Sequence, residues 1–70
     1  MEPRDQFAAN LRRLRTAAEL SQEGLSELSG LHSTEISRLE RGVRDPRLST
    51  VVRLARALRV EPALLLADMQ

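Results

Sequence analysis

Apolar residues recur three or four positions apart in two long stretches of the chain, the spacing that gathers side chains on one face of a helix. The first stretch predicts a helix from about Arg4 to Ala18, with an inner face of Phe7, Leu11, Leu14 and Ala18. The second predicts a helix that Ser49 can cap, with an inner face of Val51, Leu54, Ala55 and Leu58. We interpret the outer face of this later helix as a solvated surface in preference to a phosphate track: Arg53, Arg56 and Arg59.

Between these stretches, residues 21 to 42 predict two short helices joined by a tight turn. Ser21 can cap the first helix by accepting a hydrogen bond from a free backbone N–H, and Gly30 can end it in the left-handed conformation. Either His32 or Ser33 can cap the second helix, and Gly42 follows its end. The predicted inner face of the pair consists of Leu25, Leu28, Ile36 and Leu39.

A last short helix is predicted to begin at Pro62, because proline has no N–H to leave unpaired in the first turn of a helix. Strand-like alternation is absent, so the chain is predicted to form five helices. Helices of two turns are marginally stable alone, because nucleation is costly, and they must pack on other helices. We therefore expect an all-α fold of five helices, forming one domain over residues 1 to 70.

The size and composition agree with a small domain of this kind. A chain of 70 residues buries only about 60% of the surface that its unfolded form exposes, so its stability is modest. The absence of cysteine excludes disulfides and zinc–thiolate sites, and no apolar run approaches the roughly 20 residues that span a bilayer. The N-terminus also lacks the pattern of a secretory signal, so we expect a cytoplasmic protein that does not bind membranes.

The positive charges are unevenly distributed. The net charge is only +1, but residues 1 to 35 carry four arginines and six acidic residues, whereas residues 36 to 70 carry seven arginines and four acidic residues. Basic side chains gather at the second of the two short helices predicted over residues 21 to 42 and in the loop after it: Arg38, Arg41, Arg44 and Arg47. Such a local cluster bears more on nucleic acid binding than the net charge does.

The order of residues in this region resembles a known family. The pattern SQxxLSxxSGLxxxxISRLERGxRxP, followed by LxxVxxLAxALxV, is similar to the lambda-repressor-like helix-turn-helix family of Cro and phage repressors, from about Phe7 to Leu66. Among small members, the chain is most similar to the controller proteins of restriction–modification systems, which are dimeric regulators. The resemblance implies a five-helix DNA-binding domain in which residues 21 to 42 meet the duplex.

The resemblance also implies roles in DNA binding at particular positions. A recognition helix of about residues 33 to 41 would present four side chains to base edges in the major groove: Ser33, Thr34, Ser37 and Arg38. Arg38 is the strongest candidate for a specific contact, because a guanidinium can donate two hydrogen bonds to guanine. Other positions match contacts with the DNA backbone: Gln22, Arg41, Arg44 and Arg47, the last of which enters the minor groove in some phage repressors.

Two further positions match a partly buried salt bridge of the family, Arg15 with Glu40, whose role would be architectural. Gly24 departs from the family pattern, because Glu or Asp is usual there, and it adds a glycine to the interior of a short helix. Glu35 also departs from it. This side chain could select cytosine, repel phosphate, pair with Arg38 or point away from DNA, so it leaves the base preference open.

No enzyme chemistry, metal or other cofactor is expected. His32 is the single histidine, and we interpret it as a capping or exposed turn residue, because no second histidine and no cysteine can complete a transition-metal site. The carboxylates are scattered among arginines, which disfavours a catalytic pair. We also expect no small-molecule ligand, because a core this small leaves little room for an internal pocket.

The C-terminal segment has more apolar side chains than one small core can bury. Leu64, Leu65 and Leu66 cannot all face inwards, because consecutive helical residues point about 100° apart. We interpret this surplus, together with Met69, as a homodimer interface; the alternatives are a frayed tail and the stump of a longer protein. A two-fold dimer would set two recognition helices about 34 Å apart and so would require a pseudo-palindromic operator.

The leading prediction is a sequence-specific transcriptional regulator that binds double-stranded DNA and is associated with the nucleoid. The alternative is a protein-interaction module of the same fold, such as an antitoxin or a transcriptional bridging factor. The regulator is preferred because the chain carries almost nothing beyond its five helices with which to cover a toxin.

Overall fold

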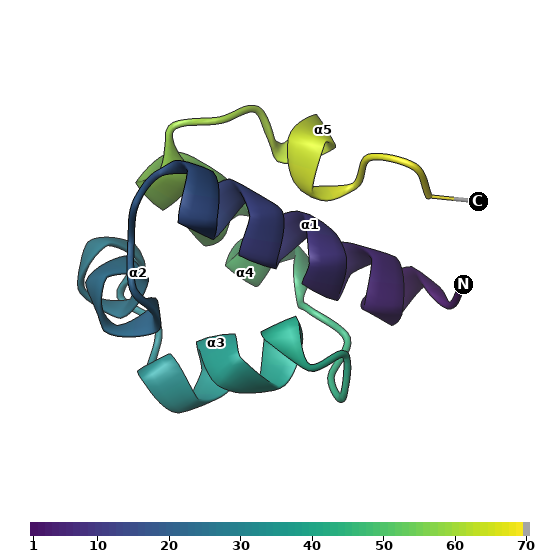
Figure 1. Cartoon of the computed structure of the whole chain (residues 1–70), viewed down its shortest axis with the longest axis horizontal. Coiled ribbons are helices and arrows are strands. Elements are labelled where there is room, and N and C mark those ends of the chain that lie inside the picture. Colours follow the sequence, from purple (N-terminus) through teal and green to yellow (C-terminus); the bar gives the residue numbers. More distant parts are fainter. Residues whose placement is uncertain (70) are drawn as a thin grey trace.

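The computed structural model describes residues 1 to 69, which form five helices joined by short connections (Figure 1). The helices are α1 (Pro3–Ala17), α2 (Gln22–Ser29), α3 (Ser33–Glu40), α4 (Leu48–Leu58) and α5 (Pro62–Leu65). Residues 1 to 69 contain no strand, which confirms the predicted all-α class. Within that range no helix has the length and apolar character needed to cross a membrane.

The five helices surround one aliphatic core. α1 packs against α3 and α5, α2 packs against α3 and α4, and α4 packs against α5. In Figure 1, α1 crosses the middle of the molecule, α3 and α5 lie on opposite sides of it, and α2 closes one end. The largest fully buried side chains come from all five helices: Phe7, Leu11, Leu25, Ile36, Leu39, Leu54, Leu65 and the polar Asn10. Every helix is therefore held in place by the same core.

The helix-turn-helix pair is punctuated largely as its sequence predicts. The Ser21 hydroxyl accepts a hydrogen bond from the backbone N–H of Gly24 at 2.9 Å, which caps α2. Gly30 ends α2 with φ of 79°, a left-handed conformation that glycine adopts without a Cβ penalty. The cap of α3 differs from both alternatives, because His32 occupies the N-cap position but its side chain makes no capping hydrogen bond, and Ser33 is already the first helical residue.

The predicted cap of α4 is wrong. α4 begins at Leu48, with Arg47 at the N-cap position and no side-chain capping bond, so Ser49 lies inside the first turn. The pattern around Ser49 suited a cap, but a helix start also depends on where the preceding loop joins it. The first backbone N–H groups of α4 therefore lack a side-chain cap, and Arg47 lies beside them.

Leu28 was predicted to be a core residue, and this prediction is wrong, because the residue is 61% exposed. The partly or fully buried positions of α2 are Gln22, Gly24, Leu25, Ser26 and Ser29. Because each helical residue turns by about 100°, Ser26 and Ser29 lie to one side of Leu25 around the helix, and Leu28 lies to the other side. The buried stripe is centred between Leu25 and the two serines, which leaves Leu28 outside it. Small serines on this stripe let α2 approach its neighbours closely, and the Ser26 hydroxyl donates a hydrogen bond to the Leu31 carbonyl.

α5 is fixed to α1 by a buried side chain. Asn10 is fully buried and donates hydrogen bonds to the carbonyls of Leu65 and Ala67, each at 2.9 Å. Its carbonyl oxygen accepts hydrogen bonds from the side chains of Gln6 at 3.1 Å and Arg13 at 3.2 Å. A helix of four residues has few hydrogen bonds of its own, so these contacts and the burial of Leu65 hold it in place.

The surplus of apolar side chains at the C-terminal end is resolved by this packing. Leu65 is fully buried in the core, whereas Leu64 and Leu66 are each 45% exposed. The prediction that Leu65 contributes to a dimer interface is therefore wrong, because this side chain is already covered within its own chain. Leu64 and Leu66 remain available to a partner.

Candidate nucleic-acid interface

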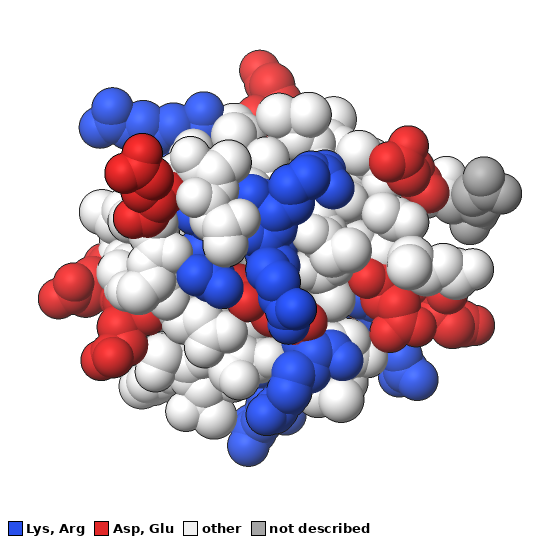
Figure 2. All heavy atoms as spheres, in the orientation of Figure 1, with Lys and Arg blue, Asp and Glu red and all other residues white. Residues whose placement is uncertain are grey.

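Arginine side chains gather on one face of the molecule. Figure 2 shows a band of them running from α1 towards α3, with most acidic side chains nearer the margins of the view. The arginines that line two grooves on this face are Arg12, Arg13, Arg15, Arg38 and Arg41. This face is therefore basic although the net charge of the chain is small. Of the predicted cluster only Arg38 and Arg41 line these grooves, and the other three arginines come from α1, which the distribution of charges along the sequence did not predict.

The first of these grooves, which we call the α2–α3 groove, lies between the start of α2 and the outer face of α3. Its lining contains all four predicted base-contact residues and three predicted neighbours: Ser33, Thr34, Ser37, Arg38, Gln22, Arg41 and Arg15. Thr34 and Arg38 are exposed, while Ser33 and Ser37 are half-buried. Ser21 and Glu23 complete the lining. The fold thus brings hydroxyl and guanidinium groups together on the outward face of a helix.

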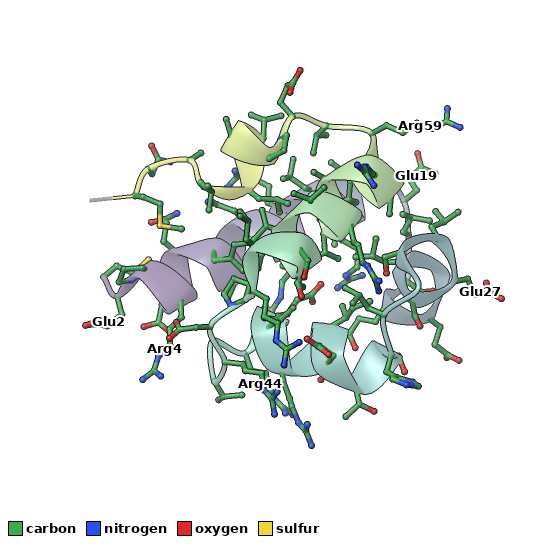
Figure 3. All side chains as sticks on the ribbon, turned by 180° about the vertical axis from the view of Figure 1, so that it is seen from behind. Glu2, Arg4, Glu19, Glu27, Arg44 and Arg59 are labelled. Carbon is green, nitrogen blue, oxygen red and sulfur yellow. The ribbon has the colours of Figure 1, made fainter. Side chains whose placement is uncertain are left out.

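The other two predicted backbone contacts, Arg44 and Arg47, lie elsewhere. They line a separate hollow beside the start of α4, together with Glu35 and Arg53. Figure 3 shows Arg44 projecting at the edge of the molecule next to the loop after α3. Arg53 was interpreted as part of a solvated face; it is exposed, and it also lines this hollow with Arg47. The sequence does not show this because it depends on the path of the loop against α4.

The structure excludes one of the roles that the sequence left open for Glu35. Both ion pairs within residues 1 to 69 involve Glu40, so the pairing of Glu35 with Arg38 that the sequence left open is not formed. Glu35 is half-buried and lines the hollow that contains Arg44 and Arg47. Glu35 therefore borders the hollow of the loop arginines and is not part of the lining of the α2–α3 groove.

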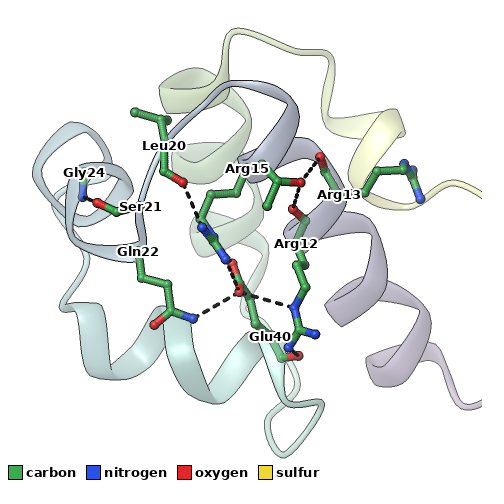
Figure 4. Close-up of polar contacts among 9 residues, drawn as sticks. Arg12, Arg13, Arg15, Leu20, Ser21, Gln22, Gly24 and Glu40 are labelled. Carbon is green, nitrogen blue, oxygen red and sulfur yellow. Dashed lines mark hydrogen bonds and ion pairs between the residues drawn. The ribbon is translucent and has the colours of Figure 1, made fainter.

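Glu40, at the end of α3, is the centre of a buried polar network (Figure 4). Its carboxylate is 1% exposed and accepts two hydrogen bonds from Arg15, at 2.6 Å from Nε and 3.0 Å from Nη2. Arg15 Nη1 also donates to the Leu20 carbonyl at 2.8 Å. The structure thus contains the ion pair implied by the family resemblance, and it ties α1 to the end of α3 in bidentate geometry.

Burial, hydrogen bonds and charges together shift the pKa values of both groups in this pair. Burial by itself would raise the pKa of the Glu40 carboxyl, but hydrogen bonds from Arg15 and Gln22, with the charges of Arg15 and Arg12, outweigh burial and hold it below its usual range. The hydrogen bond to Glu40 raises the pKa of Arg15 despite the opposing effect of burial. Both groups are therefore charged at neutral pH.

Gln22 and Arg12 connect this network to the surface. Gln22 Nε2 donates to Glu40 Oε1 at 3.1 Å, which fixes the side chain that was predicted to contact a phosphate. An amide nitrogen has two N–H groups, so one remains for another acceptor. Arg12 was not predicted as a functional residue, although it lies three positions before Arg15 and so on a neighbouring part of the same helix face. Its Nη2 donates to the Glu40 backbone carbonyl at 3.3 Å.

Two short helices around a glycine turn, with arginines and hydroxyls on the outer face of the second, define a helix-turn-helix DNA-binding domain. The chain belongs to the HTH_3 helix-turn-helix family, which it matches over residues 11 to 65. The family consists of DNA-binding transcription regulators of the Cro and phage-repressor type, and it is not a class of enzymes.

Individual relatives agree with this assignment. The chain is similar to control protein C.SmaI of Serratia marcescens, with 47% identity over 58 residues, which are 83% of this chain and 69% of that protein. It is 38% identical to control protein C.BamHI of Bacillus amyloliquefaciens over 57 residues, which are 80% of this chain and 70% of that protein. The predicted resemblance to controller proteins is thus confirmed.

Solved structures support the same fold. The restriction–modification controller protein C.AhdI from Aeromonas hydrophila matches with a TM-score of 0.86 and 45% identity, over 89% of this chain and 94% of that one. The DNA-binding domain of the P22 C2 repressor matches with a TM-score of 0.81 and 26% identity, over 91% and 86% of the two chains.

Proposed function

We propose that this protein is a sequence-specific transcriptional regulator that binds a pseudo-palindromic operator as a homodimer, with α3 in the major groove. The observation that carries the proposal is the α2–α3 groove, which collects the predicted base-contact residues Ser33, Thr34, Ser37 and Arg38. Membership of a family of DNA-binding regulators supports it. The names of the relatives favour a role as the control protein of a restriction–modification system. Such a protein would act at DNA in the cytoplasm.

The chemistry of each residue suggests its part in binding. Arg38 is exposed on the outer face of α3 and can donate two hydrogen bonds to guanine, a contact worth about 1–3 kcal/mol of discrimination. Thr34 can contact a thymine methyl group, and Ser33 or Ser37 can donate or accept. Gln22 and Arg41 flank these residues and would hold phosphates, which sets the register of α3 on the duplex.

Arg44 and Arg47 would bind the backbone on the other side of α3. They lie with Arg53 beside the start of α4, whose first N–H groups have no side-chain cap. The N-terminal end of a helix favours negative charge, so phosphate is a suitable partner there. Glu35 lies in the same hollow and would limit how closely a phosphate can approach.

A selection from random DNA tests this function directly. The protein is mixed with a pool of duplexes of random sequence, and the bound fraction is sequenced. We expect an enriched palindrome, and we expect Arg38→Ala to relax base preference at particular positions while non-specific affinity changes little. Arg56→Ala is the matched control, because Arg56 is exposed in the C-terminal half of α4. Failure to enrich any palindrome would favour an interaction module, such as an antitoxin or a bridging factor.

The homodimer would use Leu64 and Leu66, whose partial exposure leaves apolar surface beside the short α5. Sedimentation equilibrium is expected to show a dimer that dissociates on Leu66→Glu, because a charge would then be buried in an apolar contact. A wild-type protein that stays monomeric both alone and on its operator would contradict the dimer without contradicting DNA binding.

A further inference from the structure

A second groove on the arginine-bearing face is formed mainly by α1, which is not part of the helix-turn-helix pair. This groove, which we call the α1 groove, runs between α1 and the end of α3, and small side chains line it together with three arginines: Ala8, Ala9, Thr16, Arg12, Arg13 and Arg41. Arg41 also lines the α2–α3 groove, so the two grooves adjoin at this residue. The basic band in Figure 2 passes over both elements that form the α1 groove.

Arg12 and Arg13 are held in place by contacts within the protein and still have free N–H donors. The Arg12 side chain is 60% exposed, and its guanidinium is anchored by the 3.3 Å hydrogen bond to the Glu40 carbonyl and by an Nε that lies 3.7 Å from Glu40 Oε1. Arg13 Nη1 donates to Asn10 Oδ1 at 3.2 Å. A guanidinium has five N–H groups, so each of these side chains keeps donors for an anion at the surface.

The carboxylates near the α1 groove do not cancel its charge. Glu40 is buried and already bonded to Arg15, so its charge is compensated inside the protein. Asp5 is the other acidic residue in the lining, against three arginines. The lining between the arginines consists of alanine methyl groups and a threonine, and such short side chains allow a bulky backbone to come close to α1.

We propose that the α1 groove binds phosphates of duplex DNA that flank the half-site read by α3. The inference rests on the proposed function, because it extends the DNA strand held at Gln22 and Arg41 towards Arg12 and Arg13. These contacts would go to phosphates only, since Arg12 and Arg13 belong to α1 and not to the recognition helix, so they would add affinity for any flanking sequence. The protein would therefore cover more DNA than its base-reading residues require.

The salt dependence of binding tests this proposal. Affinity for the selected operator is measured at several salt concentrations with two duplexes, one that ends at the palindrome and one that continues for a further helical turn of about 10 base pairs on each side. Each phosphate contact contributes about 0.9 to the slope of log K against log salt. On the long duplex, Arg12→Gln with Arg13→Gln is expected to reduce the slope by about 1.8 for each bound protomer. On the short duplex the variant is expected to match the wild type.

Two further variants make the result specific. Arg12→Lys with Arg13→Lys keeps both charges and should restore most of the slope, because lysine also binds phosphate as a point charge. Arg56→Gln with Arg59→Gln removes two exposed arginines of the distant end of α4 and should leave the slope unchanged; Figure 3 shows Arg59 at the opposite side of the molecule from Arg44. Thermal melting of each variant checks that the fold is intact.

The outcomes separate this proposal from the function on which it rests. If the glutamine variant has the wild-type slope on both duplexes, or loses the same amount on both, the flanking contact is refuted while operator binding stands. If the wild-type protein selects no DNA sequence, the proposed function fails first. A slope that depends on both the duplex length and the two charges supports the proposal.

Discussion

Arg15→Ala should destabilise the whole domain, although Arg15 lines the groove proposed to bind DNA. The guanidinium is bonded to a carboxylate that is only 1% exposed, and the Arg15 side chain itself is 14% exposed. Removing it leaves Glu40 with one hydrogen bond from Gln22 and a longer contact with Arg12, while the charge remains buried. Breaking a buried ion pair in this way costs about 3–5 kcal/mol.

That loss is large for a chain of this size. A domain of 70 residues has a free energy of unfolding of about 4–10 kcal/mol, at roughly 0.05–0.15 kcal/mol per residue. In a small domain, 1 kcal/mol lowers the melting temperature by about 4–8 °C, so a loss of 3 kcal/mol or more predicts a fall of at least about 12 °C. We expect part of the Arg15→Ala protein to be unfolded at room temperature.

Circular dichroism melting and urea titration measure this effect, with Arg56→Ala as the control for loss of one exposed arginine. Arg15→Leu combined with Glu40→Leu removes both charges and should recover most of the stability, because the damage comes from the stranded carboxylate. If Arg15→Ala melts at the same temperature as Arg56→Ala, the pair does not stabilise the fold, and the reasoning from its burial is refuted.

Three further predictions concern stability. Folding lowers the pKa of Glu40, so its ionised carboxylate stabilises the fold above the unfolded pKa of about 4.3, and this stability is lost as the pH falls through the folded pKa. The melting temperature of Glu40→Gln should therefore fall less steeply between about pH 6 and 3 than that of the wild type. Asn10→Ala leaves the Leu65 and Ala67 carbonyls without their donor, which should lower the free energy of unfolding in urea titration by about 1–3 kcal/mol. It should also speed proteolysis of the C-terminal segment, and proteolysis at the wild-type rate would show that Asn10 does not hold α5. Gly42→Ala places a Cβ 2.4 Å from Asp5 Oδ1 and puts a side chain on a residue with φ of 72°, so it should lower the melting temperature for both reasons. Adding Asp5→Ala should restore only the part due to the close contact, and full recovery would show that the backbone conformation is not strained.

Much of the fold follows from local patterns in the sequence. The periodicity of apolar residues predicts α1 nearly to its ends and the buried face of α4, because a helix depends on residues three or four positions apart. Leu28 and Leu65 show where this reasoning stops. A pattern gives the direction of a helix face, but the burial of each side chain depends on which neighbour covers it, and that neighbour comes from a distant part of the chain.

The candidate site divides in the same way. The residue order from Ser21 to Gly42 identifies the family, and the four base-contact candidates on α3 lie in one groove because a single short helix carries them all. The separation of Arg44 and Arg47 into a second hollow with Glu35 could not be predicted, since it depends on the path of the loop after α3.

The sequence alone determined that this protein is a helix-turn-helix DNA-binding domain, because capping residues, the glycine turn and the arginine cluster are encoded within a few consecutive turns. The tertiary structure decided how distant residues meet. Glu40 contacts Arg15 and Gln22, which lie 25 and 18 positions before it, and Asn10 holds carbonyls 55 and 57 positions after it. The α1 groove likewise exists only because α1 packs against the end of α3. Local hydrogen bonding determines a helix, whereas these contacts depend on how the helices pack around a common core.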